Sequence, residues 1–366
     1  MYILSHPIMG NYGGMLQAIA LSNVVECVAY TPRYINLDVE KKRQGWYWFV
    51  RFFLRRILHN TKIRTSYPIV LQEIITMVKS WLCCVDCEPT CLCNLSELES
   101  SRWIIGSDQV WRAGFVRYYG PVDNFFLSNV TKEIRNLSIS YSASFGSDEW
   151  EGSPEETEEC GRLLREFKAV SVREHSGVKI CKDVFGVDAV QMPDPTLLLH
   201  PEDYGKIIDS EKTWFPEGKY VAAYILDETA GKAELLQNSV KSVDMQLQHL
   251  MPHADAKKRR DRFPISVPQW LSLIRDCEYF ITDSFHGCVF AIIYNKPFVC
   301  LGNEGRGNAR FDTLLGTFGL EDRMITDATP EKVLQILNTP IDWAKVNAIH
   351  DAERERGINF LKENLT

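Results

Sequence analysis

Short apolar runs alternate with amphipathic stretches along most of the chain, and this alternation constrains the fold more than any other feature of the sequence. In the first half, the apolar runs predict strands at 33–38, 102–108, 136–144, 169–174 and 188–194. In the second half, they predict strands at 219–226, 245–251, 278–284, 297–302 and 323–326. Between them, stretches such as "GMLQAIALSNVV" and "EECGRLLREFK" are typical of helices. Strands that alternate with helices indicate an α/β protein with parallel sheets and helices on both faces.

The length of the chain predicts two domains. It has 366 residues, which suits two domains of ~100–200 residues each. A polar stretch at 200–218, which contains proline and glycine, interrupts the alternation. We therefore predict a first domain over 1–205 and a second over 206–340, each built on a doubly wound sheet. Ligands of such sheets bind outside the carboxyl ends of the strands, so the residues that end each predicted strand are candidate site residues.

Charge and hydropathy exclude some classes of protein. The formal net charge is −7, which argues against a nucleic-acid-binding protein that relies on its overall charge. The N-terminal stretch lacks the basic and apolar regions of a secretory signal. No stretch reaches the ~18 apolar residues of a membrane-spanning helix. We therefore expect a cytoplasmic protein with reduced thiols.

Five cysteines gather between Cys83 and Cys93. Cys84 and Cys87 have the spacing of half a zinc site, but no second pair follows at the distance that such a site requires. We interpret the cluster as structural or incidental and predict no metal site.

A glycine-rich turn at 10–21 leads into a predicted helix. Gly13 and Gly14 permit a close approach of the backbone, and the first N–H groups of a helix can bind an anion or sugar hydroxyls. The spacing matches neither a P-loop nor a dinucleotide-binding motif. Taken alone, the pattern favours an ordinary turn between a strand and a helix.

Asp108 and Arg173 each end a predicted strand. Asp108 is placed to accept a proton or bind hydroxyls, and it also suits the N-cap of the helix that follows. The planar cation of Arg173 suits a carboxylate or a phosphate, and the alternative is a salt bridge to Glu174 or a neighbouring helix. Asp194, between two prolines, is interpreted as structural rather than catalytic.

The stretch "DSFHGCVFA" places His286 where a buried strand ends and a helix begins. This position directs His286 toward the expected ligand site, beside the N–H groups of the helix. Arg306 and Arg310 follow the next strand. One histidine and three arginines therefore converge on an anion site, which suits a ligand that carries both a carboxylate and a phosphate.

Seven stretches in this order resemble the polysaccharide pyruvyl transferase family. They are "NYGGMLQAIAL", "IIGSDQVWR", "SYSASFG", "VSVREHSG", "PDPTLLL", "DSFHGCVFAIIYNKPFV" and "RF..LLGTFGLEDR", which extend from about residue 10 to residue 323. The resemblance implies two Rossmann-like domains in a GT-B-type arrangement. It also implies that a C-terminal helix within 341–366 crosses back to the first domain.

The resemblance implies a reaction and its residues. Phosphoenolpyruvate donates its three-carbon unit to two hydroxyls of one sugar, which forms a cyclic ketal and releases phosphate, without a further cofactor. The acid that protonates the donor's methylene carbon and the base are assigned to His286 and Asp108. Better-known members carry arginine and leucine just before the histidine, where this chain has Ser284 and Phe285. The expected donor-binding residues are Arg173, Ser284, Phe285, His286, Arg306 and Arg310. The expected acceptor-binding residues are Asn11, Tyr12, Gly13, Gln17, Gln109 and Ser142.

The segment 41–64 has eight Lys or Arg residues and no Asp or Glu. As a helix, it would gather aromatic side chains on one face with basic side chains beside them, which suits an anionic membrane surface. The residues expected to contact the membrane are Trp46, Phe49, Phe53, Arg51, Arg55 and Arg56. The alternative is a helix that covers the sheet of the first domain. We expect peripheral binding at the inner face of the cytoplasmic membrane, where a lipid-linked sugar acceptor would be at hand.

Two other functions fit the same sequence. One is a GT-B glycosyltransferase that uses a nucleotide sugar, and the other is a non-catalytic protein that binds anionic glycans. Release of phosphate from phosphoenolpyruvate distinguishes the pyruvyl transferase from both alternatives.

Overall fold

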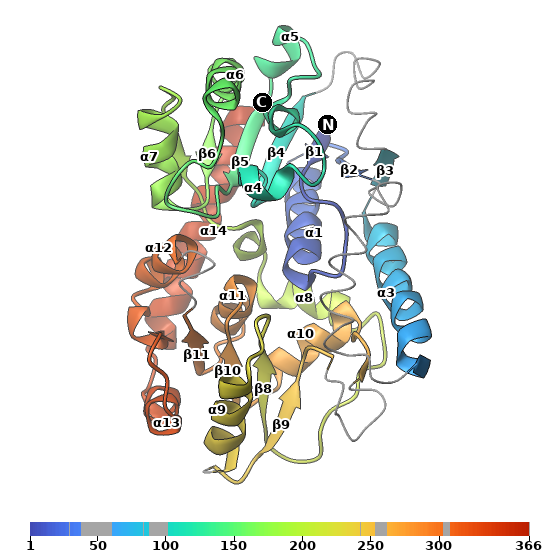
Figure 1. Cartoon of the computed structure of the whole chain (residues 1–366), viewed down its shortest axis with the longest axis vertical. Coiled ribbons are helices and arrows are strands. Elements are labelled where there is room, and N and C mark those ends of the chain that lie inside the picture. Colours follow the sequence, from blue (N-terminus) through green and yellow to red (C-terminus); the bar gives the residue numbers. More distant parts are fainter. Residues whose placement is uncertain are drawn as a thin grey trace.

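The computed structural model describes residues 1–28, 30–37, 61–82, 84–87, 102–241, 243–252, 262–302 and 308–365. They form two parallel β-sheets with helices packed on their faces, one sheet above the other in Figure 1. The expected α/β class is therefore confirmed. The predicted helix at 41–64 lies outside the described residues, except for 61–64, which begin helix α3.

The first sheet has seven parallel strands in the order β3-β2-β1-β4-β5-β6-β7. The strands are β1 (Tyr2–Leu4), β2 (Arg33–Leu37), β3 (Cys84–Cys87), β4 (Trp103–Asp108), β5 (Ile139–Ala143), β6 (Ser171–Val172) and β7 (Val190–Gln191). The strand order reverses between β1 and β4, which is where such a sheet binds its ligands. All five strands predicted for this half are confirmed. β1 and β3, the second of which lies within the cysteine cluster, were not predicted.

The second sheet has five parallel strands in the order β12-β11-β10-β8-β9. The strands are β8 (Tyr220–Tyr224), β9 (Gln246–His249), β10 (Tyr279–Thr282), β11 (Phe298–Leu301) and β12 (Met324–Ile325). All five were predicted. Every residue of β4, β8 and β11 is buried, as continuous apolar strands covered on both faces should be.

Helices cover both sheets. Around the first sheet they are α1 (Tyr12–Cys27), α3 (Thr61–Trp81), α4 (Ala113–Val116), η2 (Val122–Phe126), α5 (Lys132–Arg135), α6 (Pro154–Leu164), α7 (His175–Asp183) and η3 (Pro195–Leu198). Around the second they are α8 (Pro201–Ile208), α9 (Ala230–Lys241), α10 (Val267–Arg275), α11 (Phe285–Ile293), α12 (Ala309–Phe318), η6 (Glu321–Arg323) and α13 (Pro330–Asn338). Helix α6 begins at a capping box formed by Ser153 and Glu156.

The two halves share one apolar core. It extends from α1, beside the first sheet, to α10 and α11, beside the second. Tyr12 at the start of α1 stacks on Trp270 of α10, with ring centroids 5.5 Å apart, and donates a hydrogen bond to the carbonyl of Ile265 at 2.7 Å. The predicted boundary between 205 and 206 falls inside α8, which packs against α10. The residues of α8 therefore pack with the second half.

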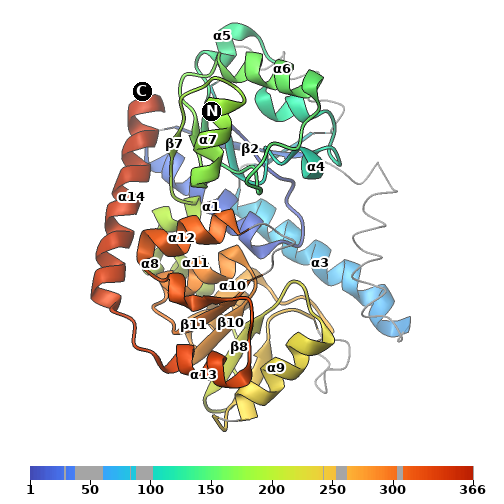
Figure 2. The ribbon, with the colours of Figure 1, turned by 60° about the vertical axis from the view of Figure 1, so that its left-hand side comes forward.

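Helix α14 (Trp343–Leu365) runs along both halves, at the left of Figure 2. It packs on α11 and α12 of the second half. Toward its end, the ring of Phe360 lies 6.0 Å from that of Tyr141 in β5, and Arg356 donates a hydrogen bond to the side-chain oxygen of Gln191 at 2.8 Å. None of the helices in the described parts of the chain combines the length and apolar character needed to cross a bilayer.

Candidate active site

Charged side chains from both sheets meet where the carboxyl ends of their strands face each other. The first sheet contributes Asp108 from the end of β4, Arg173 directly after β6, and Asp194 shortly after β7. The second contributes His286, in the first turn of α11 after β10. These four residues, which we call the central cluster, are buried in the described structure. The sequence placed three of them at a ligand site and judged Asp194 to be structural.

Arg173 is the centre of this cluster, with only 2% of its surface exposed. Its Nη2 lies 3.0 Å from the carboxylate of Asp194 and donates a hydrogen bond of 2.6 Å to Ser107 Oγ. Its Nη1 lies 3.6 Å from Asp108 Oδ1. Nη1 and Nε have no hydrogen-bond partner in the described structure. A buried guanidinium normally satisfies its donors, so the N–H groups on these two nitrogens are available to an anionic ligand.

The alternative for Arg173, a salt bridge to Glu174, is not what the structure shows. Glu174 is fully buried and its Oε1 accepts hydrogen bonds from the backbone N–H groups of Phe145 and Gly146, at 2.6 and 3.1 Å. Burial raises the pKa of Glu174. This carboxyl group therefore fixes the turn after β5, while Arg173 points to the facing strand ends.

Asp194 has a structural role and also contacts the site. Its Oδ1 accepts hydrogen bonds from the backbone and the hydroxyl of Thr196, at 2.9 and 2.6 Å, and so caps η3. Its other oxygen faces Arg173 and lies 3.6 Å from His286 Nε2. Burial by itself would raise the pKa of Asp194, but the charges of Arg173 and His286 outweigh it and hold that pKa well below its usual range. Asp194 is therefore the carboxylate partner of His286.

The position of His286 depends on its neighbours in both halves. Ser284 accepts a hydrogen bond from Gly287 N at 3.3 Å and caps α11, so its hydroxyl is occupied by the helix. The imidazole lies against the backbone of Gly13, where a Cβ atom would stand 2.0 Å from Nδ1. Gly13 therefore lets the start of α1 approach His286. Nε2 of His286 has no hydrogen bond.

Phe285 lies close to two arginines. The guanidinium carbon of Arg173 is 5.0 Å from the ring centroid and that of Arg310 is 5.8 Å away, which are cation–π distances. Burial lowers the pKa of Arg310 to about 10, so this side chain is still protonated at neutral pH. Nε of Arg310 is also without a hydrogen bond. Arg306, the other predicted donor residue after β11, lies outside the described residues.

Asp108 occupies a left-handed backbone conformation, with φ of 69°, which aspartate tolerates better than most residues. Its carboxylate accepts a hydrogen bond from the backbone N–H of the next residue, Gln109, at 3.0 Å. Burial would raise the pKa of Asp108, but Arg173, His6 and His286 together lower it below the ordinary value. Asp108 is thus an ionised carboxylate among cations.

Several of the six predicted acceptor residues have partners within the protein. Tyr12 is committed to the contact between the halves described above. Gln17 Nε2 donates hydrogen bonds to Ser5 Oγ and to the carbonyl of Gly14, at 3.2 and 3.0 Å. Ser142 is fully buried in β5 and donates to the carbonyl of Met192 at 3.2 Å. Asn11 is exposed and Gln109 is partly exposed, and Gly13 contacts His286. Acceptor binding by these residues stays a prediction.

The sequence did not single out His6 or Ser107. His6 follows β1 and Ser107 lies in β4, so the rule that strand ends carry the site would have found His6 if β1 had been recognised.

Among the described residues, no group of three or more His, Cys, Asp or Glu side chains is placed to hold a metal ion. The arrangement offers an imidazole, two cations with unpaired N–H groups and ionised carboxylates. It can therefore bind a compact anion and transfer a proton to it.

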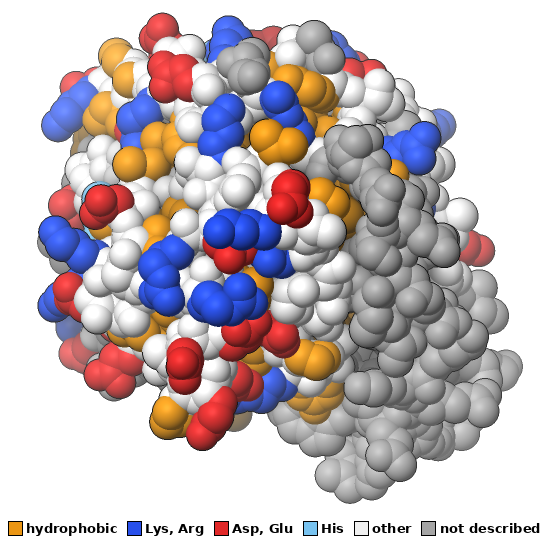
Figure 3. Space-filling view, turned by 90° about the horizontal axis from the view of Figure 1, so that it is seen from above, with side chains coloured by type: hydrophobic (Ala, Val, Ile, Leu, Met, Phe, Trp, Pro, Cys, Tyr) orange, Lys and Arg blue, Asp and Glu red, His pale blue; other side chains and the backbone are white. Residues whose placement is uncertain are grey.

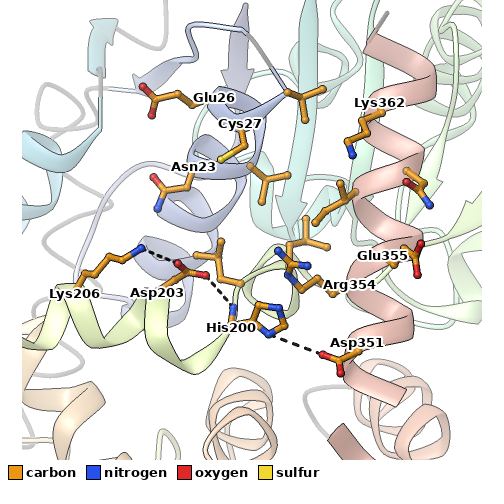
Figure 4. A pocket seen from close by; sticks show the side chains of 16 residues that line it. Asn23, Glu26, Cys27, His200, Asp203, Lys206, Asp351, Arg354, Glu355 and Lys362 are labelled. Atoms are coloured by element: carbon orange, nitrogen blue, oxygen red, sulfur yellow. Dashed lines mark hydrogen bonds and ion pairs between the residues drawn. The ribbon is translucent and has the colours of Figure 1, made fainter. Parts of the chain in front are cut away.

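A separate cavity of about 920 Å³ lies between α1, α8 and α14. Figure 4 shows side chains of both signs around it, with Lys206 paired to Asp203 at 3.0 Å and His200 facing Asp351 at 3.9 Å. No residue of the central cluster lines it. The mixed charges give no preference for one class of ligand.

The chain matches the sequence model of one family, polysaccharide pyruvyl transferase, over residues 11–305. A comparison with curated proteins gives no significant match.

Several solved structures are similar over the whole chain. The glycotransferase of kitacinnamycin has 12% identity and a TM-score of 0.53, and the alignment covers 100% of this chain and 98% of that one. UGT89C1 from Arabidopsis thaliana has 10% identity and a TM-score of 0.53, with coverage of 100% and 99%. MnaA from S. aureus, determined with UDP, has 14% identity and a TM-score of 0.54, with coverage of 100% and 97%. These likenesses show the fold, which is the predicted pair of Rossmann-like domains in a GT-B-type arrangement.

Proposed function

Because the chain belongs to the polysaccharide pyruvyl transferase family, we propose that it moves the pyruvyl group of phosphoenolpyruvate onto two hydroxyls of one sugar. The sugar belongs to a precursor of a surface or capsular polysaccharide. The products are a cyclic ketal and inorganic phosphate. Phosphoenolpyruvate is the only small molecule that this reaction requires, with no metal ion and no further cofactor.

One observation carries this proposal: Arg173 is buried, has two nitrogens without hydrogen-bond partners, and lies within the cluster that holds His286. Phosphoenolpyruvate is small and carries a carboxylate and a phosphate on one carbon. Arg173 and Arg310, both within cation–π distance of Phe285, supply two cations for these two groups. A purely apolar ligand would not satisfy these donors.

The chemistry also needs an acid. Protonation of the methylene carbon, C3, makes C2 electrophilic, and His286 is the proton donor in this scheme. The carboxylate of Asp194 faces this imidazole, 3.6 Å from its Nε2. The arginines hold the carboxylate and stabilise the charge of the departing phosphate. Asp108 lies beside Arg173 and serves the acceptor side.

Product analysis tests the proposal. The purified protein is incubated with phosphoenolpyruvate and a panel of lipid-linked sugars, and free phosphate is measured together with the mass of the acceptor. The proposal is supported if the mass of the acceptor increases by that of pyruvic acid less one water and an equimolar amount of phosphate is released. Release of a uridine nucleotide from a nucleotide sugar would instead support the glycosyltransferase. Binding of anionic glycans without turnover would support the non-catalytic alternative.

Substitution of Arg173 by lysine is expected to weaken the phosphoenolpyruvate complex at least about 10-fold. Lysine keeps the charge but loses the planar fork that holds two oxygens at once, and it cannot reach Asp108, Asp194 and Ser107 together. Calorimetric titration of both proteins with phosphoenolpyruvate measures the effect. Arg117→Lys is the matched control, because Arg117 makes an exposed pair with Glu156. Equal affinities for wild type and Arg173→Lys would make Arg173 a structural residue.

We also propose that the segment 41–64 holds the enzyme at an anionic membrane, where the acceptor is lipid-linked. The support is its sequence, because Trp46, Phe49, Phe53 and the arginines 51, 55 and 56 lie outside the described residues. On the face that Figure 3 shows, basic and acidic side chains of the described residues are interspersed. The described residues on that face therefore form no basic surface comparable to the segment 41–64. The proposal rests on the sequence of this segment.

Wild-type protein is expected to sediment with anionic liposomes at low salt and to be released only in part at high salt. Each Lys or Arg near such a surface contributes ~1 kcal/mol that salt screens, whereas burial of the aromatic side chains persists. Replacing Trp46, Phe49 and Phe53 together by serine should remove the salt-resistant part. Neutral liposomes are the control. Wild-type protein that ignores anionic liposomes at low salt would contradict membrane binding by this segment.

A further inference from the structure

We propose that His6 is a second catalytic histidine, the base that takes the proton from the attacking hydroxyl of the sugar acceptor. This inference rests on the proposed function and deepens it, because it assigns the acceptor side of the site. His6 directly follows Ser5 at the end of β1, the strand at which the order of the first sheet reverses. Ligands of doubly wound sheets bind at that reversal.

The backbone at His6 is held in place from two sides. Its carbonyl accepts a hydrogen bond of 2.7 Å from the hydroxyl of Tyr34 in β2. On the other side, Ser5 Oγ donates a hydrogen bond of 2.7 Å to the carbonyl of Ser107 in β4. His6 therefore stands next to the strand end that carries Asp108, and its position does not depend on the ring nitrogens.

The imidazole of His6 is buried but unsatisfied. Only 8% of the residue is exposed, and its ring meets the ring of Phe115 edge-on, at 5.0 Å and 87°. Neither Nδ1 nor Nε2 makes a hydrogen bond of regular geometry, although the backbone of Gln109 lies close enough to the ring to raise its pKa. His350 on α14 is also buried, yet its Nε2 lies 3.0 Å from the carbonyl of Leu197. His350 is therefore held by a regular hydrogen bond, whereas His6 has only the contact with the Gln109 backbone and can still bind a hydroxyl.

The charged groups around the imidazole of His6 are consistent with a role as a general base. Burial lowers the pKa of His6, and the charge of Asp108 opposes this effect only in part. The ring is therefore neutral at pH 7 and able to accept a proton. The same carboxylate interacts with both His6 and His286, so it stabilises whichever imidazole carries the proton. The other ionisable neighbours are Arg173, whose charge also lowers the pKa of His6, and Tyr119, whose pKa is raised by burial.

An aromatic surface lies beside His6 and can receive the sugar. Phe115 touches the imidazole and is 38% exposed, and Tyr118, in the turn after α4, is 55% exposed. Such rings present an apolar face, which matches the C–H face of a pyranose and leaves its hydroxyl edge to point at polar groups. This geometry points to an uncharged sugar ring at the His6 side and the anionic donor at the Arg173 side.

The reaction requires two protein groups that transfer protons, one that donates and one that accepts. The two attacking hydroxyls lose two protons in all, C3 of the donor gains one, and the departing phosphate leaves with the other. His286 gives its proton to C3, and His6 removes the proton of the first hydroxyl as its oxygen bonds to C2. When the C2–O bond to phosphate breaks, the proton on His6 leaves with the phosphate. The second hydroxyl then adds to C2, and its proton restores His286.

Substitution of His6 by glutamine tests the proposal, with p-nitrophenyl β-galactoside, β-glucoside and β-mannoside as acceptors. Phosphate release from phosphoenolpyruvate is expected to fall by about 10²-fold or more, the usual contribution of a general base. The Kd of phosphoenolpyruvate should stay within about twofold, because His6 does not touch the donor. His350→Gln is the matched control for the loss of a buried histidine. His6→Gly should regain activity in proportion to added imidazole, which a merely structural residue would not do.

The outcomes separate the two proposals. If wild type releases phosphate and His6→Gln does so at a similar rate, only the role of His6 is overturned. A loss of donor affinity equal to the loss of turnover, or no rescue by imidazole, would also overturn it. If wild type releases no phosphate with any of the three glycosides or with the panel of lipid-linked sugars, the proposed function is contradicted and the role of His6 falls with it.

Discussion

Replacement of His286 by alanine is expected to lower phosphate release from phosphoenolpyruvate by about 10²–10⁴-fold, the range that a general acid contributes. Stability should change little. Asp194 would still face Arg173, whose Nη2 lies 3.0 Å away, so the substitution leaves no buried carboxylate without a cation. Stopped-time phosphate assays and thermal melting measure the two effects on the same preparation.

The partly buried histidine at the start of α8 provides the control. The side chain of His200 faces Asp351 at 3.9 Å and the ring of His350 at 6.2 Å, away from the central cluster, so turnover of His200→Ala should stay near wild type. Activity of His286→Ala above about a tenth of wild type is incompatible with proton donation by this residue. A large fall in melting temperature would instead mean that His286 mainly supports the packing of α11 on α1.

Substitution of Gly13 by alanine is expected to lower turnover by about 10²-fold, although residue 13 itself contributes no reacting group. A Cβ atom there would stand 2.0 Å from Nδ1 and 2.7 Å from Cβ of His286. Because the second distance involves the base of the side chain, rotation of the imidazole cannot relieve the clash, and the starts of α1 and α11 must move apart. A shift of ~1 Å at a reacting group costs on the order of 10²-fold, and the overpacking costs ~1–3 kcal/mol of stability.

Gly205, in α8, is the matched control because nothing lies within 4 Å of the Cβ atom that Gly205→Ala would add. That change should stabilise the protein by up to ~1 kcal/mol through helix propensity and leave turnover unchanged. Measurements of phosphate release and chemical denaturation on both variants give the comparison. If Gly13→Ala turned over at the wild-type rate, the contact between the starts of α1 and α11 would not be what positions His286.

The class of fold and the family are evident from the order of the amino acids alone. All ten predicted strands are present, since buried parallel strands are continuous apolar runs and the helices between them are amphipathic. The family follows from motifs that lie at strand ends, where a doubly wound sheet carries its ligands. For the same reason the sequence placed Asp108, Arg173 and His286 at the site. The short strands β1 and β3 gave too weak a signal, and His6 was overlooked with β1.

Which of these residues lie together, and which partner each one has, is visible only in the folded chain. Asp194 was judged structural, yet it is the partner of both Arg173 and His286, because β6 and β7 end and α11 begins at one place, although Asp194 and His286 are 92 positions apart in the sequence. Gly13, which was predicted to bind the acceptor, is also the contact surface of His286. A short stretch of sequence shows the periodicity of its apolar residues, its propensity for helix or strand, and where a strand ends. The pairing of buried charges depends on strand order and on the packing of two domains, which residues far apart in the sequence determine together.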